Sequence, residues 1–492
     1  MFCQVGFNAS RNIPKSRHNF SDYLPPRQDQ ELVLAPLQVQ SMKKYIKSTK
    51  PKNSLDINGV STKLLHFVAD QIATPLCHIF NLSIRTGIFP DKFKISKTCP
   101  IYKKGDQMDP ENYRGVSLID NLSKVFEKIL AFKIKEFLDS NNFFYKHQYG
   151  FRPNMNTNQA LLDIINDITK EINKDRPTVA VFFDVAKAFD AVPHNILFAK
   201  LEHYGIRGNA LELIKSYFNG RRQKVCVNGT YSENLCDILL GVLQGSVLGV
   251  LLFIIYINDL PNASSANCKN VIFADDNTSL ISGNSLQDLL IKANYEIDNL
   301  LHWYSANKLA IHPDKCRAMV FLPGYRTINN EDFPLFLDYN EHGNFDMDNY
   351  KPIKIIPNEK ETSFKLLGVH IDHKLNLKDH VKHVHSKVSK SNFALNQMKN
   401  FVDKKHLKML SNAYVKSHVD YCTNLLTNCT ASTLKPLNVA LKKSIRIIAG
   451  AGRHDHTNSL FKAENVLPLD KSIEYNALVF MHSYKYLSLI HI

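Results

Sequence analysis

Two neighbouring carboxylates, Asp275 and Asp276, lie in the stretch VIFADDNTSL at residues 271–280. Four residues suited to a buried strand precede the pair and polar residues follow it, which predicts a β-hairpin with two acids at its turn. Two anions at contact distance raise each other's pKa, so a positive partner is expected, and a divalent metal ion is the obvious candidate. A solvated Asp–Asp turn is the alternative that the pair alone leaves open.

A third acid, Asp184, follows the apolar run Thr178–Phe183, which is typical of a strand buried on both faces. A carboxylate at the end of a buried strand is costly unless it has a partner. Two strands that each end in acid can bring three carboxylates together, and such oxygen donors suit Mg²⁺ in a two-metal site. That site would orient a 3′-hydroxyl and stabilise departing pyrophosphate oxygens. Alone, Asp184 is also compatible with a helix N-cap.

A basic turn contains Lys103 and Lys104, and Arg114 follows at the start of an apolar stretch. Arg offers phosphate oxygens a fork of donors and Lys offers a point charge, so these groups could hold a triphosphate. Further along, the stretch 241–246 (GVLQGS) opens an apolar helix. It places the amide of Gln244 and free backbone N–H groups at a helix start, where anions bind well.

The elements that must position these groups alternate between helices and strands, as the hydrophobic periodicity indicates. Strands are expected at 98–102, 178–183, 224–228, 318–322 and 364–371. Helices are expected at 36–52, 61–86 (split at Pro75), 122–138, 157–174, 197–218, 247–259, 285–306, 380–418 and 431–449.

Composition predicts a globular protein with more than one domain and a polyanionic partner. The chain has 492 residues, of which 44% are hydrophobic and 22% charged, and a net charge of +15. Nucleic acid is the expected partner, ahead of a membrane surface, because the excess charge comes from Lys and Arg. The longest apolar run is about half of a membrane span and is expected to be a buried helix. The Lys-rich helical stretch 380–418 suits a sugar-phosphate backbone, with a solvated Lys face as the alternative.

The remaining compositional signals concern the compartment and the irregular segments. The nine Cys form no CxxC pair or zinc spacing, so all are expected to be reduced thiols of an intracellular protein. No clear targeting signal is visible, which leaves nucleus and cytoplasm both open. Residues 1–35 are interpreted as a polar linker or cut edge, and residues of about 324–360 as an acidic inserted loop.

The order and content of these stretches resemble the reverse transcriptase of non-LTR (LINE-type) retrotransposons, most of all the jockey-type elements. The resemblance covers roughly residues 50 to 480, with the motifs in the family's order. The matching stretches are FPDKFKISKTCPIYKKGD, NYRGVSLIDNLSKVFEKIL, HQYGFRPNMNT, FFDVAKAFDAVPH, GVLQGSVLGVLLFIIYINDLP, FADD, WYSANKLAIHPDK and FKLLGVHID.

The resemblance implies an α+β fold, a right-hand polymerase with a ferredoxin-like palm sheet and a helical thumb. The implied organisation is an N-terminal extension or truncated edge at 1–50, fingers at 51–175, a palm at 176–375 and a helical thumb and C-terminal region at 376–492. The palm is expected to contain interleaved fingers elements and the acidic inserted loop. No endonuclease domain precedes the polymerase, so the chain is not expected to nick its own target.

The resemblance also implies the reaction, which is RNA-directed addition of dNTPs to a primer 3′-hydroxyl with two Mg²⁺ ions, or Mn²⁺ in their place. The expected partners are an RNA template, a DNA primer or target and dNTPs, with no membrane. The alternative hypothesis is a catalytically decayed relic that binds nucleic acid without turnover. A splicing-type maturase with a related palm fits the motifs less well.

The implied site residues fall into four groups. Asp184, Asp275 and Asp276 match the catalytic metal ligands, and Lys315 matches the lysine that protonates pyrophosphate. Lys103 or Lys104 and Arg114 would touch the triphosphate, and Phe189 would exclude a ribose 2′-hydroxyl. Gln244, Gly245 and Ser246 would lie along the nucleotide and template. Leu367 and Gly368 match the turn that grips the primer end.

The sequence departs from the family pattern at a few turns. Prolines usual in the family are replaced by Gly115, Leu243 and Val250, and a usual Ser is replaced by Asn156. Lost prolines loosen turns that position the substrate, and this is the basis of the relic hypothesis. The three acids are intact, which argues against the most direct form of decay.

Overall fold

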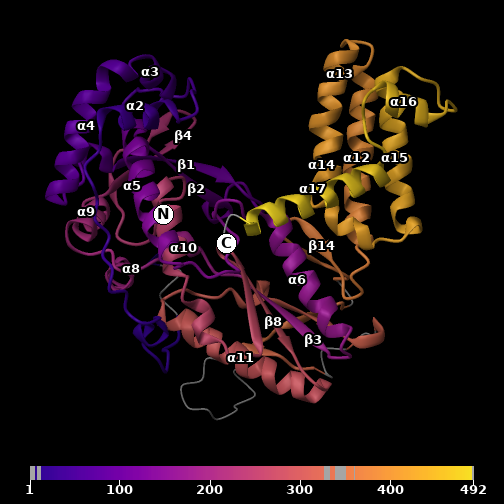
Figure 1. The fold of residues 1–492 in the computed structure, drawn as a ribbon, viewed down its shortest axis with the longest axis horizontal. Helices are drawn as coiled ribbons and strands as arrows, with labels where there is room; N and C mark the ends of the chain where they lie inside the picture. The colour runs from indigo at the N-terminus through magenta and orange to yellow at the C-terminus, as the bar shows by residue number, and fades with distance from the viewer. Residues whose placement is uncertain are drawn as a thin grey trace.

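The computed structural model describes residues 6–7, 13–325, 328, 333–337, 351–358 and 361–489. Most of the acidic loop expected at 324–360 therefore lies outside the described residues. Figure 1 shows N-terminal helices on one side, C-terminal helices on the other and a sheet containing β3 and β8 below and between them.

The sheet that carries the acids has five strands in the order β12-β9-β3-β8-β7. Their bounds are β3 Thr178–Phe183, β7 Cys268–Phe273, β8 Asp276–Ser282, β9 Arg317–Phe321 and β12 Lys354–Ile356. β3 pairs antiparallel with both of its neighbours, β8 and β9. The central place of β3 explains why its sequence is an unbroken apolar run, since its two edges and both faces are covered.

Two helices supply the cover on the faces of β3. Val179, Val181 and Phe183 belong to the core that includes α11 (Leu286–Ala306). Ala180 and Phe182 belong to a second core that includes α6 (Thr157–Ile172). Successive side chains of a strand point to opposite faces, so one strand contributes to both cores. The prediction of a strand buried on both faces is confirmed.

A second sheet lies in the N-terminal half and joins segments far apart in the chain. Its strands are β1 Ile95–Tyr102, β2 Tyr113–Ile119, β4 Arg222–Val227, β5 Thr230–Tyr231 and β6 Cys236–Asp237. β1 forms an antiparallel hairpin with β2 and pairs in parallel with β4. The helices of this half are α2 Val39–Lys47, α3 Thr62–Phe67, α4 Ala69–Thr86, α5 Asn121–Ser140, α7 Ala188–Ala191, α8 His194–His203, α9 Gly208–Phe218 and α10 Val247–Tyr256.

The predicted split of the helix pair at Pro75 is wrong. The helices separate at Val68, whose φ of −96° and ψ of 13° leave helical geometry, and Pro75 lies inside α4. A proline inside a helix removes a backbone hydrogen bond. Here the buried face of α4, which includes Leu76 and Phe80, outweighs that local preference.

The apolar run before residue 257 forms α10, which is buried as expected. Among the helices that the structure describes, none has the length and hydropathy to cross a membrane.

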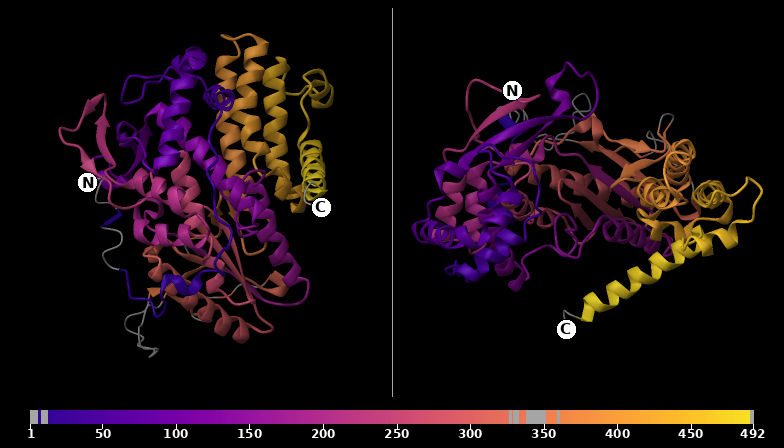
Figure 2. Two further views of the ribbon diagram at one scale, coloured as in Figure 1. Left: turned by 60° about the vertical axis from the view of Figure 1, so that its left-hand side comes forward. Right: turned by 90° about the horizontal axis from the view of Figure 1, so that it is seen from above.

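The C-terminal part consists of a small hairpin and a set of helices. The single strand expected at 364–371 is in fact two strands, β13 Phe364–Leu366 and β14 Val369–Ile371. Leu367 and Gly368 have φ of 45° and 88°, and this left-handed turn reverses the chain. The helices are α12 Lys378–Met398, α13 Lys404–Ser411, α14 Ser417–Asp420, α15 Ala431–Ala449, α16 Thr457–Ala463 and α17 Leu469–Leu489. The view from above in Figure 2 shows α17, in yellow, extending beyond the other C-terminal helices.

Residues 16–37, called the strap below, include most of the stretch 1–35 that was interpreted as a polar linker or cut edge, and they are hydrogen-bonded to three helices. The Ser16 hydroxyl donates to the carbonyl of His302 (2.9 Å). His203 Nε2 donates to the Pro25 carbonyl (2.6 Å). Leu37 N donates to Asn81 Oδ1 (2.7 Å). The strap thus crosses from α11 over α8 to α4, because its backbone groups find partners that polarity alone does not reveal.

One cysteine also departs from expectation. Cys236 takes part in a disulfide bond, which corrects the prediction that all nine are reduced. The free cysteines among the described residues are Cys77, Cys99, Cys226, Cys268, Cys316, Cys422 and Cys429. Disulfide pairing depends on the distance between two cysteines in space, which their spacing in the sequence does not give.

Candidate active site

The three predicted acids meet at one edge of the five-stranded sheet. Phe183 at the end of β3 pairs with Asn277 on β8, so Asp184 and Asp276 follow at the same edge. Phe273 pairs with Asp276, which leaves Ala274 and Asp275 as a two-residue turn between β7 and β8. The predicted hairpin is therefore confirmed, with its acids at and beside the turn.

The electrostatics of this edge are unfavourable for the acids alone. Burial, and then the charges of Asp275 and Asp184, raise the pKa of Asp276 to about 6. The pKa of Asp275 is also raised, first by burial, with the charge of Asp184 adding to it. Both acids keep some contact with solvent. Acids that are held together in this way bind a cation more readily than an uncharged surface does.

Lys315 lies beside Asp184 because of the strand register. Phe182 pairs with Arg317 on β9, so the residue two positions before Arg317 comes opposite Asp184. Lys315 Nζ forms an ion pair with Asp184 Oδ2 at 3.1 Å, and both side chains are over 40% exposed (44% and 41%). The sequence prediction of a lysine near the acids is matched in position, and its role remains a prediction.

A cavity of about 500 Å³ opens beside Asp184 and Asp275. The predicted site residues that line it are Lys103, Lys104, Arg114, Asp184, Phe189, Gln244, Asp275 and Lys315. Burial and the charges of Arg114 and Lys315 lower the pKa of Lys103. Several cations thus crowd around one cavity, which is an arrangement that an anionic ligand stabilises.

Three of the cations that line the cavity come from the β1–β2 hairpin. Tyr102 pairs with Tyr113 at its end, and Lys103 N donates to the Asn112 carbonyl (2.9 Å). Lys103 and Lys104 are exposed in the loop, and Arg114 is exposed on β2. The hairpin therefore carries three exposed cationic side chains at the cavity that Asp184 and Asp275 also line.

Phe189 is fixed by aromatic packing within the cavity wall. It lies on α7, its ring stacks on Phe253 at 4.2 Å between centroids, and it meets Phe151 edge-on at 6.5 Å. Such packing holds the ring in one position. A rigid aromatic side chain beside the acids is what exclusion of a sugar hydroxyl requires.

The three predicted residues of the loop before α10 lie in different surroundings: Gln244 lines the cavity, whereas Gly245 and Ser246 do not. Gln244 lines the cavity, and its carbonyl accepts a hydrogen bond from Ser117 N (2.9 Å). Gly245 has φ of +113°, and a Cβ there would lie 2.7 Å from the Ser117 carbonyl. Ser246 is buried and caps α10 by accepting from Gly249 N at 2.7 Å. Neither Gly245 nor Ser246 is among the cavity-lining residues.

Leu367 and Gly368 form the β13–β14 turn and do not line this cavity. The Tyr421 hydroxyl donates to the Leu367 carbonyl at 2.5 Å. A Cβ on Gly368 would lie 3.1 Å from the Tyr421 ring. The turn is thus attached to the C-terminal helical region.

Two residues without an assigned role in the sequence analysis support the site. Asp190 lines the cavity and accepts from Gln244 Nε2 at 2.7 Å. Gln148 is fully buried, and its Oε1 accepts from Gly150 N (2.9 Å) and Ala274 N (3.4 Å), next to Asp275. Their only sequence signal is their place inside the motifs FFDVAKAFDAVPH and HQYGFRPNMNT.

Gly150 shows how tightly this support fits. A Cβ on Gly150 would lie 2.3 Å from Ala274 N, so only glycine allows this approach to the acidic turn. Tyr149 N also donates to the Ile272 carbonyl (2.8 Å), which extends the sheet beside β7.

Within the described part of the chain, no group of three or more His, Cys, Asp or Glu side chains is placed so as to hold a metal ion. The donor chemistry nevertheless fits Mg²⁺, because the edge offers carboxylate oxygens, and burial first and then the charges of neighbouring acids raise the pKa of Asp276 and Asp275. In the described geometry, Asp184 is paired with Lys315.

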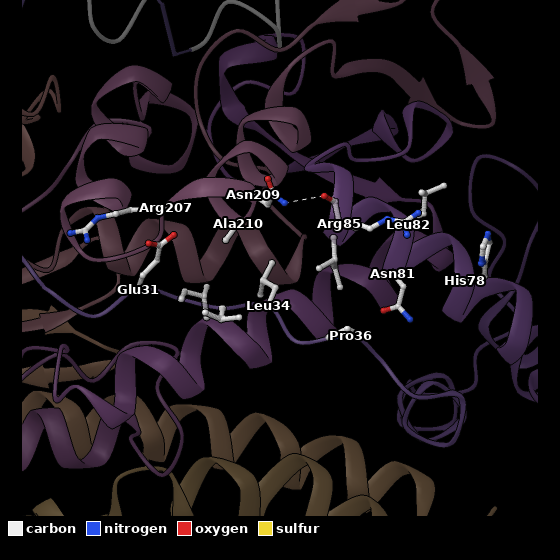
Figure 3. A pocket seen from close by; sticks show the side chains of 13 residues that line it. Glu31, Leu34, Pro36, His78, Asn81, Leu82, Arg85, Arg207, Asn209 and Ala210 are labelled. Atoms are coloured by element: carbon white, nitrogen blue, oxygen red, sulfur yellow. Dashed lines mark hydrogen bonds between the residues drawn. The ribbon is translucent and has the colours of Figure 1, made fainter.

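A second cavity, of about 570 Å³, lies between the strap, α4 and α9. Figure 3 shows Arg85, Arg207 and Glu31 around it, with Asn209 Nδ2 donating to the Arg85 carbonyl at 2.9 Å. None of the predicted site residues lines it.

Comparisons with known proteins agree with this geometry. The model of the family described as Reverse transcriptase (RNA-dependent DNA polymerase) matches residues 101–371. The mixed helix-and-sheet architecture is thus that of a polymerase fold. Since the match covers more than half of the chain, the chain belongs to the reverse transcriptase family.

Three relatives indicate the kind of element. The chain is 29% identical to the probable RNA-directed DNA polymerase from transposon BS of Drosophila melanogaster, over 58% of this chain and 32% of the relative. It is 24% identical to the RNA-directed DNA polymerase from mobile element jockey of Drosophila funebris, over 86% and 45%. It is 33% identical to the probable RNA-directed DNA polymerase from transposon X-element of Drosophila melanogaster, over 40% and 22%.

The resemblance to jockey-type non-LTR elements inferred from the motifs is thereby confirmed. The matches cover less than half the length of each of these relatives.

Proposed function

We propose that this chain is an RNA-directed DNA polymerase that adds dNTPs to the 3′-hydroxyl of a DNA primer on an RNA template. The observation that carries the proposal is the meeting of Asp184, Asp275 and Asp276 at one sheet edge, beside a cavity with cationic side chains. Acids and cations that line one cavity are the groups that a metal-bound triphosphate needs.

The parts of the fold are assigned to a right-hand polymerase. β3, β7, β8 and β9 lie in the order β9-β3-β8-β7, which is that of a ferredoxin-like βαββαβ unit, and we assign this sheet to the palm. The hairpin β1–β2 with the helices before it forms the fingers, and β4 joins it as an interleaved element. α6 shares a core with the palm sheet and goes with it. The helices after residue 376 form the thumb.

The acids of the edge would hold Mg²⁺, or Mn²⁺ in its place, with Asp184 and Asp275 as the main ligands and Asp276 in support. Two such ions supply Lewis acid stabilisation for the attacking and departing oxygens. Asp184, which is paired with Lys315 through Oδ2, would present its carboxylate oxygens to the metal ion. Lys315 would hold a proton close to the departing pyrophosphate.

The other side chains bind and select the nucleotide. Lys103, Lys104 and Arg114 would neutralise the triphosphate from the β1–β2 hairpin. Phe189, held against Phe253, would exclude a 2′-hydroxyl and so favour dNTPs. Gln244 would contact the nucleotide, and Gly245 would let the loop pass close to Ser117.

The nucleic acid partners are an RNA template and a DNA primer or target. The turn at Leu367 and Gly368 would hold the primer end, and the Lys-rich helices that follow would contact the sugar-phosphate backbone. We place this activity inside the cell, on RNA in the cytoplasm or on DNA in the nucleus.

Primer extension tests the proposal directly. The chain is mixed with an RNA template, an annealed DNA primer, dNTPs and Mg²⁺, beside its Asp275→Ala/Asp276→Ala variant. Extension by the parent alone is the expected result. Equal RNA binding by both proteins with no extension by either would identify a folded relic and overturn the proposal.

A further inference from the structure

The segment that contains α7 and the loop before α10 form one wall of the cavity, and backbone hydrogen bonds join them. Val242 N donates to the Phe189 carbonyl at 2.7 Å, and Gly241 N donates to the Val192 carbonyl at 2.8 Å. His194 Nε2 donates to the Gly241 carbonyl at 2.9 Å. Helix α7, which carries Phe189, and the segment after it are therefore hydrogen-bonded to the loop that leads to α10.

The approach of the two segments is closest at Gly241. Its φ of +84° is unfavourable for other residues, and a Cβ would lie 2.7 Å from backbone atoms of Asp190. This approach brings together the side chains of two cavity-lining residues, Asp190 and Gln244.

The contact between these side chains has a direction. Gln244 Nε2 donates to Asp190 Oδ2 at 2.7 Å. An ionised carboxylate only accepts hydrogen bonds, so it selects the amide orientation in which the NH₂ group faces Asp190. The amide oxygen and the second N–H of Gln244 are then directed to other partners. Burial raises the pKa of Asp190 to about 6, which leaves the carboxylate ionised at pH 7 and above.

We infer that Asp190 is a positioning residue that sets the amide orientation of Gln244, and thereby the pattern of donor and acceptor that Gln244 presents to the incoming nucleotide. The inference rests on the proposed function, because it needs a nucleotide in the cavity. Asp190 acts through Gln244 and needs no contact of its own with the substrate.

A double-mutant cycle on nucleotide affinity tests this inference. The variants are Asp190→Ala, Gln244→Ala and the double variant, and the readout is the Kd of a fluorescent dTTP analogue. Binding is measured with Mg²⁺, an RNA template and a dideoxy-terminated DNA primer, so that no turnover occurs. Each single variant is expected to weaken binding about 10-fold, and the double variant no further than Gln244→Ala, because both remove the same interaction.

Asp190→Asn distinguishes an effect on the Gln244 amide orientation from a purely structural role of Asp190. It keeps the size of the side chain and a hydrogen bond to Gln244, and removes only the obligatory acceptor. We expect weaker nucleotide binding with a melting temperature within about 2 °C of the parent. Equal affinity of the parent and Asp190→Asn, or single effects that multiply to about 100-fold in the double variant, would overturn the inference.

The same measurements separate this inference from the proposed function. A parent that extends primers, with an Asp190→Ala variant of unchanged affinity, loses the inference and keeps the function. A parent that binds the analogue without extending primers loses the function, and the cycle still decides the inference. A parent that does not bind the analogue loses both.

Discussion

Two groups of charged side chains in this molecule differ in burial and in pairing: one is a buried ion pair, and the other is a cluster of acids in contact with solvent. Lys200 and Asp259 form a salt bridge at 2.7 Å, and both side chains are 0% exposed. Lys200 Nζ also donates to the Tyr256 carbonyl at 2.7 Å. At the acidic edge, in contrast, three carboxylates lie together, Asp184 is ion-paired with Lys315, and the pKa of Asp276 is raised to about 6.

The difference shows which charges the protein neutralises with its own side chains and which charges it leaves without a full set of opposite charges. A buried charge must be paired inside the protein, because removing it from water is costly. The acids at the edge keep contact with solvent, so the fold tolerates their repulsion. A positively charged ligand can then reduce the repulsion between the acids, and this gain in free energy contributes to its binding affinity.

The largest expected effect comes from removing an acid at the edge. Asp275→Ala should reduce the primer-extension rate about 10³-fold or more, because metal binding loses a ligand. Asp70→Ala is a control, since Asp70 is an acid paired with Lys43 on the surface of α4. It should change the rate less than about 2-fold. An active Asp275→Ala variant would contradict the assignment of the edge.

Breaking the interior pair should affect stability instead. Lys200→Met leaves Asp259 buried without its cation, and we expect a loss of about 3–5 kcal/mol in the free energy of unfolding. Urea denaturation measures this loss. The double variant Lys200→Met/Asp259→Leu should recover most of it, because no unpaired charge remains. A Lys200→Met variant as stable as the parent would remove the contrast between the two groups.

The Gln244 loop offers a smaller test of fit. Gly245→Ala combines a φ of +113° with a contact of 2.7 Å to the Ser117 carbonyl, which should cost about 1–3 kcal/mol of stability. Gly229→Ala is the matched control, since Gly229 has φ of +87° with no atom within 4 Å of the added Cβ. The difference in urea midpoint between the two variants reports the contact alone. Equal midpoints would show that the loop moves enough to accommodate the added Cβ.

The smallest effect is a dependence of stability on pH. The folded-state pKa of Asp276 is raised to about 6 from 3.8, so the folded protein binds this proton more tightly than the unfolded chain does. The acid therefore lowers stability as pH rises from about 4 to about 6, and the full penalty persists above that range. Without Mg²⁺, Asp276→Asn should melt about 2 °C or less above the parent at pH 7.5, because solvent screens the charge.

At pH 4 the melting temperatures of the parent and Asp276→Asn should coincide. Adding Mg²⁺ at pH 7.5 should stabilise the parent more than the variant. A variant that melts below the parent at pH 7.5 without Mg²⁺ would reverse the sign and contradict the repulsion at the edge.

The sequence predicted the parts of the site that depend on local patterns. The bounds of Thr178–Phe183 and Ala431–Ala449 agree with the structure, because a continuous apolar run indicates a buried strand and an amphipathic helix has a clear period. Asn156, which replaces a usual Ser, caps α6 by accepting from Gln159 N at 3.0 Å. The acidic hairpin also follows from its pattern.

The parts that were missed depend on long-range contacts or unusual backbone. The β13–β14 hairpin turns at Leu367, a residue type that rarely takes positive φ. The contact between Asp190 and Gln244 joins residues 54 positions apart. Lys200 and Asp259 sit in stretches whose periodicity says nothing of their partner. Roles carried over by family resemblance, such as that of Ser246, do not reveal that its hydroxyl caps α10.

The strap has a consequence for the order of events during synthesis. Ser16 bonds to His302, which lies 286 positions later in the chain. At a translation rate of about 5–20 residues per second, roughly 15–60 s separate the two residues. Over that time this end of the strap lacks its partner on α11, so a nascent chain has a long interval in which a chaperone can bind it.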